Sequence, residues 1–191
     1  NESEKAAEHF YKTIQIDPNY ANGYNNLGTT LESLGSIDKP KEFYEKAIQI
    51  QPDFAEAHSN LGIEFKKLGQ KRKAKNCFEK AAKFGPEKLA HFYYLSEFKE
   101  KILNIKLKKL IIEVINKNIK KKNNISYAYY LLSKYENKKR NYKKEINYLK
   151  KGHSFYFKYN KENFATKKED WFNTIPALRK INNLEKNKRK T

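Results

Sequence analysis

Residues 24–28 read YNNLG and residues 58–62 read HSNLG, so the chain repeats an asparagine, a leucine and a glycine at an interval of 34. Placing residues 21–54 over residues 55–88 extends the match through the whole segment. The aligned positions include Leu34 and Leu68, Gly35 and Gly69, the triplet EKA at 45–47 and 79–81, and Pro52 and Pro86. A period of 34 is typical of repeats built from two helices and a turn. The sequence therefore predicts an array of helix pairs.

Each repeat contains two stripes of apolar or small residues at helical spacing. In residues 21–54 the first stripe comprises Tyr24, Leu27, Gly28, Leu31 and Leu34, and a glycine then supplies the stop signal. The second stripe comprises Phe43, Tyr44, Ala47, Ile48 and Ile50. It ends before Pro52, because proline cannot continue the helical hydrogen-bond ladder. Small residues let the two helices approach closely, while large ones fill the next layer.

This pattern resembles the tetratricopeptide repeat over residues 19–88. That family places large, leucine, small and large residues in the first helix, and small, aromatic, small and proline residues in the second. The matching residues are Tyr24, Leu27, Gly28, Leu31, Pro40, Tyr44, Ala47 and Pro52, and then His58, Leu61, Gly62, Phe65, Ala74, Phe78, Ala81 and Pro86. Pro40 replaces the usual alanine, at a place where the first helical turn tolerates proline. The resemblance implies an all-α fold, a right-handed α–α superhelical solenoid of tetratricopeptide helix pairs, with full repeats at 19–54 and 55–88.

The N-terminal residues 1–18 match only the second helix of a preceding repeat. The matching residues are Ala6, Phe10, Thr13 and Pro18. A half-repeat leaves an apolar face uncovered, so we expect the sequence to be part of a longer chain. The same face could pack against a second copy of the chain, so self-association through this helix stays open.

Asn26 and Asn60 occupy the same position in successive repeats. The resemblance places them on the concave face of the solenoid, which the first helix of each repeat lines. A side-chain amide has one acceptor and two donors, so it can hold the N–H and the C=O of an extended peptide. Such a row is similar to the asparagine ladder in the repeats attached to O-GlcNAc transferase, whose motifs these repeats resemble. The alternative is that both are solvated polar residues in a chain with 21 asparagines.

The predicted peptide groove contains ten residues of the two first helices. They are Asn22, Asn25, Asn26, Thr29, Glu56, Ser59, Asn60, Ile63, Lys66 and Lys67. Lys66 and Lys67 make this side of the groove partly basic and could attract an acidic peptide or a C-terminal carboxylate. They do not reproduce the multi-lysine clamp of chaperone-binding family members, and the alternative is that they form a solvated charged face. In the next unit Tyr94 takes the asparagine position, so two rungs of the ladder are visible.

The repeat pattern weakens after Pro86. Residues 89–125 predict a degenerate helical pair with a basic loop, in which Lys108 and Ile115 stand where small residues belong. An amphipathic face is nevertheless formed by Leu103, Leu107, Leu110, Ile111 and Val114. We expect this face to pack in the core rather than on an anionic membrane. Residues 126–159 predict another helix pair through Tyr129, Leu132, Ser133, Tyr142, Leu149 and Gly152, although Glu136 and Glu145 replace apolar and small residues.

The segment LKKGHSFYFKYNKENFATKKEDWF at 149–172 resembles the last repeat and connector of bacterial tetratricopeptide proteins that continue into a sulfotransferase domain. The matching residues are Lys151, Gly152, His153, Tyr156, Tyr159, Trp171 and Phe172. Helical spacing predicts that residues 160–191 form a capping helix and a basic tail, with Trp171, Phe172, Ile175, Leu178 and Ile181 on one face. The sequence lacks the glycine- or serine-rich loop that would bind the phosphate of a sulfonate donor. Any such activity would lie beyond Thr191.

The net charge of +19 raises nucleic acid or an anionic membrane as partners. The basic residues are 37 Lys and 4 Arg, and asparagine is also abundant, a mixture typical of AT-rich codon usage. Proteins that read nucleic-acid sequence favour Arg and place aromatic residues among the basic ones. We therefore rank nucleic acid below a peptide as the partner, and codon usage stays open as the origin of the charge.

No catalytic, cofactor or metal site is expected in this sequence. The single cysteine, Cys77, cannot form an internal disulfide, and the four histidines are scattered. Neither a signal peptide nor a run of about 18 apolar residues is present, so we expect a cytoplasmic protein. The leading hypothesis is a non-catalytic scaffold that binds a peptide or protein segment in its concave groove. The alternatives are the substrate- or partner-recruiting arm of a sulfotransferase and, more weakly, a basic nucleic-acid-binding surface.

Overall fold

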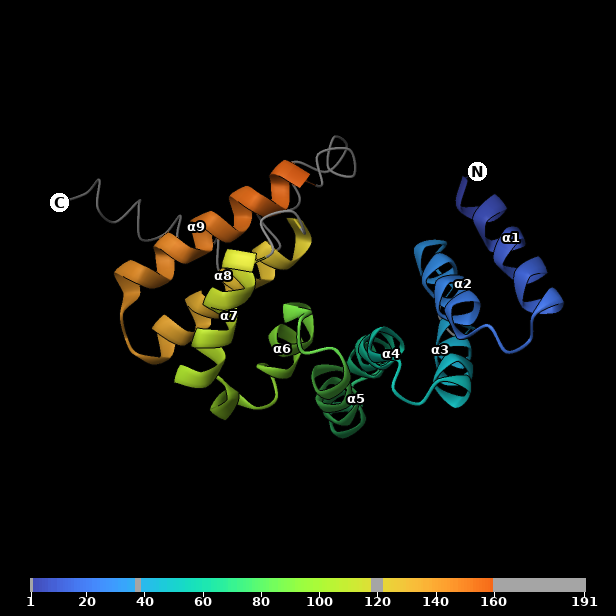
Figure 1. Ribbon diagram of the computed structural model, residues 1–191, viewed down its shortest axis with the longest axis horizontal. Helices are drawn as coiled ribbons and strands as arrows, with labels where there is room; N and C mark the ends of the chain where they lie inside the picture. The colour runs from blue at the N-terminus through green and yellow to red at the C-terminus, as the bar shows by residue number, and fades with distance from the viewer. Residues whose placement is uncertain (1, 37–38, 118–121, 160–191) are drawn as a thin grey trace. The chain divides into compact units, whose positions relative to one another are not determined.

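The computed structural model describes residues 2–36, 39–117 and 122–159, which are helical apart from their turns (Figure 1). The first compact unit, Asn1–Ile102, contains α1 (Glu2–Ile16), α2 (Ala21–Ser33), α3 (Lys39–Ile50), α4 (Ala55–Lys67), α5 (Lys71–Phe84), α6 (Leu89–Leu95) and a short 3-10 turn (Glu100–Ile102). The second unit, Leu103–Thr191, contains α7 (Ile105–Lys117), α8 (Lys122–Lys138) and α9 (Tyr142–Tyr159). No strand occurs in these described ranges, which confirms the all-α fold class.

The two helices of each regular repeat are held together by an aromatic ring lying on a glycine. A Cβ atom built on Gly28 of α2 would stand 2.7 Å from Cε1 of Tyr44 on α3. One built on Gly62 of α4 would stand 2.7 Å from Cε1 of Phe78 on α5. Both rings are fully buried. The small residue and the aromatic residue of the repeat pattern are therefore direct contact partners.

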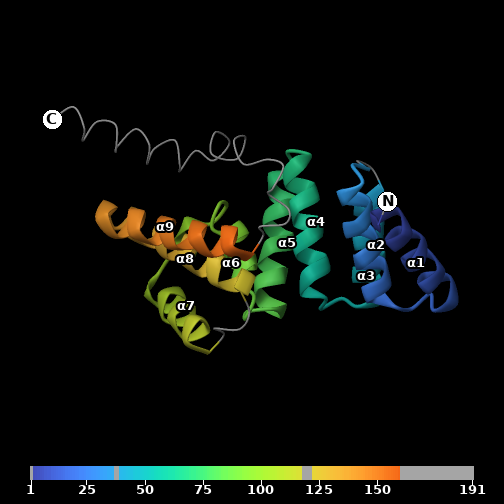
Figure 2. The same ribbon diagram turned by 90° about the horizontal axis from the view of Figure 1, so that it is seen from above.

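The same contact occurs in the second unit with its partners exchanged. Here the glycine, Gly152, lies on the second helix α9, and the ring of Tyr130 on α8 would stand 2.8 Å from its Cβ. The antiparallel pair of α8 and α9 can be followed in Figure 2. The helix pair predicted at 126–159 corresponds to α8 and α9. Its ring lies on the first helix and its glycine on the second, the reverse of the regular repeats.

One turn geometry connects the helices of three pairs. After α2 and α4 the chain passes through Gly35 (φ 79°) and Gly69 (φ 69°), and after α8 it passes through Arg140 (φ 58°). In each case the next backbone N–H donates to a carbonyl five residues earlier: Ser36 to Leu31 (3.1 Å), Gln70 to Phe65 (2.8 Å) and Asn141 to Glu136 (2.9 Å). This is the hydrogen bond of the Schellman motif, which satisfies a carbonyl at the helix end. Glu136 therefore stands at the repeat position of Leu31 and Phe65, as the sequence register predicted.

The helix α6 closes the first unit rather than opening a new one. Its Tyr94 stacks on Phe78 at 5.3 Å between ring centroids, and Phe98 stacks on the same ring at 5.8 Å. Both side chains pack on the buried cluster that also contains Leu61, Phe65 and Leu95. Residues 89–102 thus lie in the same compact unit as the regular repeats.

The amphipathic helix α7 packs in the core, as its sequence predicted. Leu107, Ile111 and Val114 are buried, while Ile105 and Ile112 remain exposed. None of the helices described for this chain combines the length and apolar character that crossing a membrane requires. The residues predicted to form the capping helix, 160–191, lie outside the described ranges.

Two of the three charged residues that break the repeat pattern in the second unit, Lys108 and Glu136, are paired with each other. Nζ of Lys108 lies 2.8 Å from Oε1 of Glu136, whose side chain is only 5% exposed. The hydrogen bond to Glu136 raises the pKa of Lys108, and the ammonium group also lies 4.6 Å from the centroid of the Tyr135 ring. Each departure from the pattern therefore compensates the other.

This pairing predicts how the second unit responds to substitution. Lys108→Met should lower the free energy of unfolding by about 3 kcal/mol, because it leaves the buried carboxylate of Glu136 without its cation. The double variant Lys108→Met/Glu136→Leu should regain most of that loss, since it leaves no buried charge. Urea denaturation followed by circular dichroism measures both. A double variant as unstable as the single one would contradict the pairing.

Candidate functional site

The ten predicted groove residues all lie on the first helices of the two regular repeats. α2 and α4 are in contact, and α2 carries four of these residues while α4 carries six. Asn22, Thr29, Lys66 and Lys67 are exposed; Asn26, Glu56, Asn60 and Ile63 are half-buried; Asn25 and Ser59 are buried. The structure thus brings the predicted set together on two neighbouring helices but gives its members different environments.

Asn60 is engaged in a hydrogen bond between the repeats. Its Nδ2 donates to Oδ1 of Asn25 at 3.0 Å and lies 3.5 Å from the hydroxyl of Thr29. Asn25 is 4% exposed, so its side-chain oxygen depends on this donor. One of the two predicted ladder residues therefore has a structural role.

Asn26 has a different environment. Its backbone carbonyl accepts a hydrogen bond from the hydroxyl of Thr30 at 2.8 Å, but its side-chain amide makes no hydrogen bond with the described residues. The residue is half-buried on α2. Its amide is therefore the member of the pair that stays available to an external backbone.

Three of the predicted groove residues are less accessible than expected. Ser59 is 6% exposed, and Asn25 lies in the contact between α2 and α4. Ile63 packs on the hydrophobic cluster of the first unit. Sequence position alone placed these residues on the groove side of the helices, but the neighbouring first helix covers part of that side.

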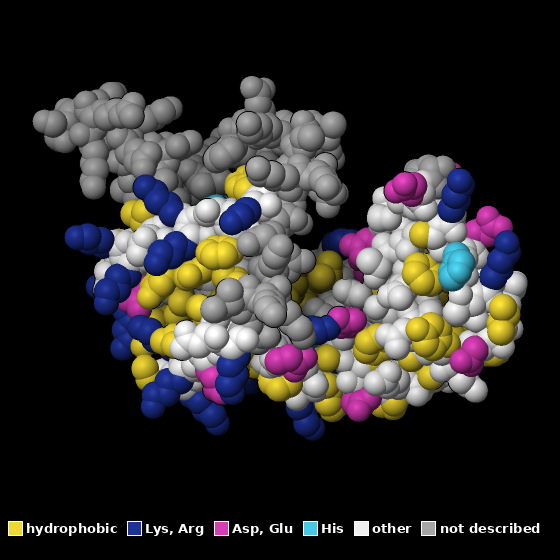
Figure 3. Space-filling view, turned by 45° about the horizontal axis from the view of Figure 1, so that its top comes forward, with side chains coloured by type: hydrophobic (Ala, Val, Ile, Leu, Met, Phe, Trp, Pro, Cys, Tyr) yellow, Lys and Arg dark blue, Asp and Glu magenta, His cyan; other side chains and the backbone are white. Residues whose placement is uncertain are grey.

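The groove lysines are already paired with carboxylates. Lys67 lies 2.5 Å from Glu32 of the preceding repeat and 2.7 Å from Glu64. Lys66 lies 2.5 Å from Glu97, and Glu56 pairs with Lys88. The expectation that Lys66 and Lys67 give the groove a basic character needs correction, because carboxylates 31 and 35 residues away in the sequence neutralise them. On the face drawn in Figure 3, acidic and basic side chains are likewise mixed over the first unit.

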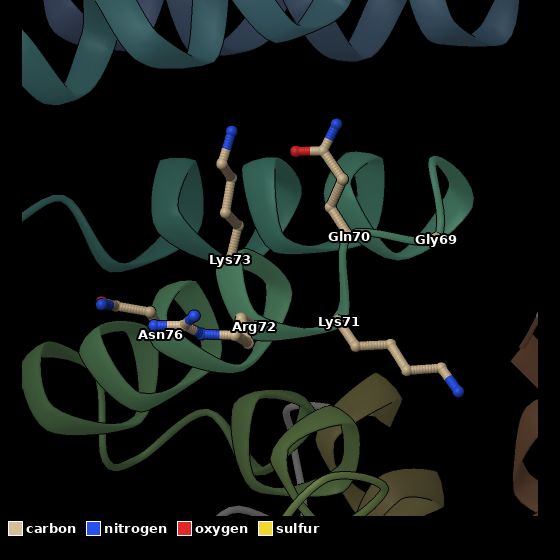
Figure 4. Close-up of a pocket in the computed structure, with 6 residues that line it drawn as sticks. All are labelled: Gly69, Gln70, Lys71, Arg72, Lys73 and Asn76. Atoms are coloured by element: carbon tan, nitrogen blue, oxygen red, sulfur yellow. The ribbon is translucent and has the colours of Figure 1, made fainter.

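A hollow lies beside the turn between α4 and α5. It has a volume of about 620 Å³ and is lined by Gly69, Gln70, Lys71, Arg72, Lys73 and Asn76. Figure 4 shows Gln70 and Lys73 pointing to one side of the turn while Lys71 points away from them. The cations diverge, so they do not enclose one anion.

The buried histidines serve packing. His58 is 2% exposed, and its Nε2 lies 2.9 Å from the carbonyl of Pro52; burial lowers its pKa. His91 stands at the repeat position of Gly23 and Ala57, and neither of its ring nitrogens has a hydrogen-bond partner among the described residues. Burial, and then the charge of Lys88, lower the pKa of His91 to about 4. Nδ1 of His153 lies 3.1 Å from the hydroxyl of Tyr130. Burial also lowers the pKa of His153.

The described residues contain no reactive thiol and no metal cluster. Burial raises the pKa of Cys77 to about 11, so its thiolate is disfavoured at neutral pH. Within the described ranges no three His, Cys, Asp or Glu residues are grouped as metal ligands would be. These findings add no candidate for catalysis to the groove.

Two family models match the segment that carries the groove. A tetratricopeptide repeat model matches residues 21–54, and a second model of the same repeat matches residues 55–88. Residues 21–88 are two consecutive tetratricopeptide repeats. No curated protein matches the sequence.

Solved structures share the architecture of these repeats. The crystal structure of MamA has a TM-score of 0.53 and 21% identity, and the match covers 83% of this chain and 91% of MamA. A second MamA structure, titled the RS-1 ArsTM double mutant, has a TM-score of 0.53 and 17% identity. That match covers 80% of this chain and 84% of the other. YrrB, described as a TPR protein with an unusual peptide-binding site, has 22% identity, and its match covers 78% of this chain and 93% of YrrB. Its TM-score of 0.48 is too low to bear on function. The MamA likeness confirms a helical solenoid and concerns the fold alone.

The two ladder asparagines should respond differently to alanine. Asn60→Ala should lower the free energy of unfolding by about 1–2 kcal/mol relative to Asn26→Ala, because it leaves the buried Oδ1 of Asn25 without a donor. Each variant is an Asn→Ala change inside a helix, so the intrinsic helix-propensity difference cancels between them. Urea denaturation of both variants measures the difference. Equal stabilities would contradict the structural role of Asn60.

The buried histidines predict a loss of stability in acid. The unfolded state binds a proton at His91 below about pH 6.5, whereas the folded state does so only near pH 4, so stability is complete above this window and falls as the pH drops through it. His91 alone should contribute a slope of about 1.4 kcal/mol per pH unit within the window. His91→Leu should flatten the curve. An unchanged slope in His91→Leu, measured by denaturation from pH 7 to 4.5, would rule out this assignment.

Proposed function

We propose that the two tetratricopeptide repeats form a non-catalytic scaffold that binds an extended peptide or protein segment along α2 and α4. The observation that carries the proposal is the uncommitted side-chain amide of Asn26, which lies half-buried on the groove-forming helix α2. An amide in that setting can accept from a backbone N–H and donate to a backbone C=O. A ligand that covers this amide removes its water and must replace the hydrogen bonds that are lost. A peptide backbone can do so, because it offers both a donor and an acceptor.

The charges of the groove restrict the peptide it would take. Glu32, Glu64 and Glu97 are paired with Lys66 and Lys67, so an acidic peptide gains little from these cations. Exposed ion pairs of this kind contribute at most about 1 kcal/mol each and lose strength with salt. We therefore expect recognition of the peptide backbone, with little dependence on the charge of its side chains.

A peptide library tests this function. Residues 1–191 are used as bait for a phage library of random 12-residue peptides, and the enriched peptides are synthesised for affinity measurement by fluorescence anisotropy. Asn26→Ala should weaken their binding about tenfold, the equivalent of one lost hydrogen bond of about 1.4 kcal/mol. N-methylation of the peptide backbone at its centre should have a similar effect, because it removes a backbone donor.

The matched control for this experiment is Asn76→Ala. Asn76 is exposed on the second helix α5, so the same chemical change is made outside α2 and α4. Affinity should stay within about twofold of the wild type. The groove proposal fails if Asn26→Ala binds the selected peptides as tightly as Asn76→Ala does.

A sulfotransferase relationship is a separate proposal. It rests on the resemblance at 149–172, of which residues 160–172 lie outside the described ranges. Under this proposal the repeats would position a substrate or a partner for a catalytic domain. The sequence signature of that domain would be a phosphate-binding loop encoded downstream of Thr191. The peptide groove would then be the recruiting surface of that enzyme.

A further inference from the structure

The positive charge of this chain is concentrated in its second unit. Residues 1–102 contain 16 Lys and Arg against 15 Asp and Glu, whereas residues 103–191 contain 25 against 7. The first unit thus has a net charge of +1 and the second +18. Codon usage can enrich lysine throughout a chain, but it does not explain why carboxylates are depleted in one unit only. On the visible face of the α7–α9 unit in Figure 3, dark blue side chains are accordingly frequent and magenta ones few.

The carboxylates that remain in the described part of the second unit are all occupied. Residues 103–117 and 122–159 contain 14 Lys and Arg but only three carboxylates, Glu113, Glu136 and Glu145. Glu113 pairs with Lys117 at 2.6 Å and Glu136 with Lys108 at 2.8 Å. Glu145 accepts a hydrogen bond from Asn137 at 2.7 Å. These two ranges therefore contain far more cations than carboxylates that could neutralise them.

The densest group of these cations lies at the turn between α8 and α9. Residues 138–144 read KKRNYKK, and the four cations Lys139, Arg140, Lys143 and Lys144 are exposed without a carboxylate partner among the described residues. We call these four residues the basic turn. Tyr142 stands in the middle of the basic turn and is 55% exposed. The turn thus combines one exposed aromatic ring with four exposed cations close to it in the sequence.

The backbone of the basic turn is fixed by hydrogen bonds. The N–H of Asn141 donates to the carbonyl of Glu136 at 2.9 Å, and the N–H of Lys144 donates to Oδ1 of Asn141 at 3.3 Å. Lys151 follows seven residues after Lys144 on α9, so the two lie on the same helix face about 10 Å apart. The cations therefore form a short track along α9 on an ordered backbone.

We propose that the basic turn and the adjoining face of α9 bind single-stranded nucleic acid through its phosphate backbone, with a base stacking on Tyr142. Lysine acts as a point charge toward phosphate, and the scarcity of Arg fits binding without sequence readout. An exposed aromatic ring among cations is the arrangement that proteins use for unpaired bases, whereas a duplex keeps its bases stacked. Membrane binding is disfavoured because a surface helix needs an apolar face to insert, and apart from Tyr142 the turn exposes only polar side chains.

The test uses the full chain and a fluorescein-labelled 20-nucleotide oligothymidine, with fluorescence anisotropy measured from 50 to 200 mM salt. The variant K139Q/R140Q/K143Q/K144Q should bind at least tenfold more weakly at 100 mM salt. It should also reduce the slope of log K against log salt by up to about 3, because each phosphate contact on a single strand contributes about 0.7. An affinity and slope equal to those of the wild type would overturn the proposal.

The chain offers a control with the same loss of charge. K71Q/R72Q/K73Q/K75Q removes four cations from α5 in the first unit, so both variants have a net charge of +15 instead of +19. The control should bind oligothymidine within about twofold of the wild type. An equal loss in the two variants would show a general charge effect and overturn the assignment to the basic turn. Should the quadruple variant fail to fold by circular dichroism, K143Q/K144Q is used, with about half the change in slope expected.

Tyr142→Ala separates nucleic acid from other anions. It should weaken oligothymidine binding about fivefold or more and leave a 20-base-pair duplex unaffected. Vesicles containing 30% phosphatidylserine and polyglutamate serve as the alternative anions. Binding to either one that is tighter than to oligothymidine and unaffected by Tyr142→Ala would overturn the nucleic-acid assignment in favour of a membrane or an acidic protein.

Discussion

The close packing of an aromatic ring on a glycine sets the geometry of each helix pair. In the regular repeats the ring belongs to the second helix, as in Tyr44 on Gly28, and in the last described pair it belongs to the first, as in Tyr130 on Gly152. A Cβ at these glycines would stand less than 3 Å from the ring, so the helices could not come this close with alanine in place of glycine. The spacing within a pair thus depends on this contact, whichever helix carries the ring.

This packing also decides which surfaces remain for binding. Because the second helix buries its ring against one side of the first helix, the other side of the first helix meets the next repeat or the solvent. Asn60 and Lys67 of α4 use that side to bind Asn25 and Glu32 of α2. Polar residues of the predicted groove therefore hold neighbouring repeats together. A substitution there should change stability as well as any binding unless, as at Asn26, the side-chain amide has no hydrogen-bond partner among the described residues.

The periodicity of the sequence predicted the helices, their turns and the register of the last pair, because these depend on local patterns. It did not predict that Lys108 and Glu136 would pair, although both had been recognised as departures from the pattern. It also assigned a basic character to Lys66 and Lys67 that their partners cancel. Ion pairs between helices depend on side-chain direction across a contact, which residue spacing within one helix does not contain. A count of charges in each half of the chain was the sequence signal that could have revealed the asymmetry between the units.

The two proposed surfaces differ in the range of their forces. The groove is nearly neutral, so a peptide would be held by hydrogen bonds that act at contact distance and change little with salt. The cations of the basic turn have no carboxylate partner among the described residues. Their attraction for an anion therefore extends to the Debye length of about 8 Å at physiological ionic strength and weakens steeply as salt rises. Raising the salt concentration should therefore release a polyanion from α9 while leaving a peptide on α2 and α4. The two proposed ligands would therefore not compete for the same charged residues.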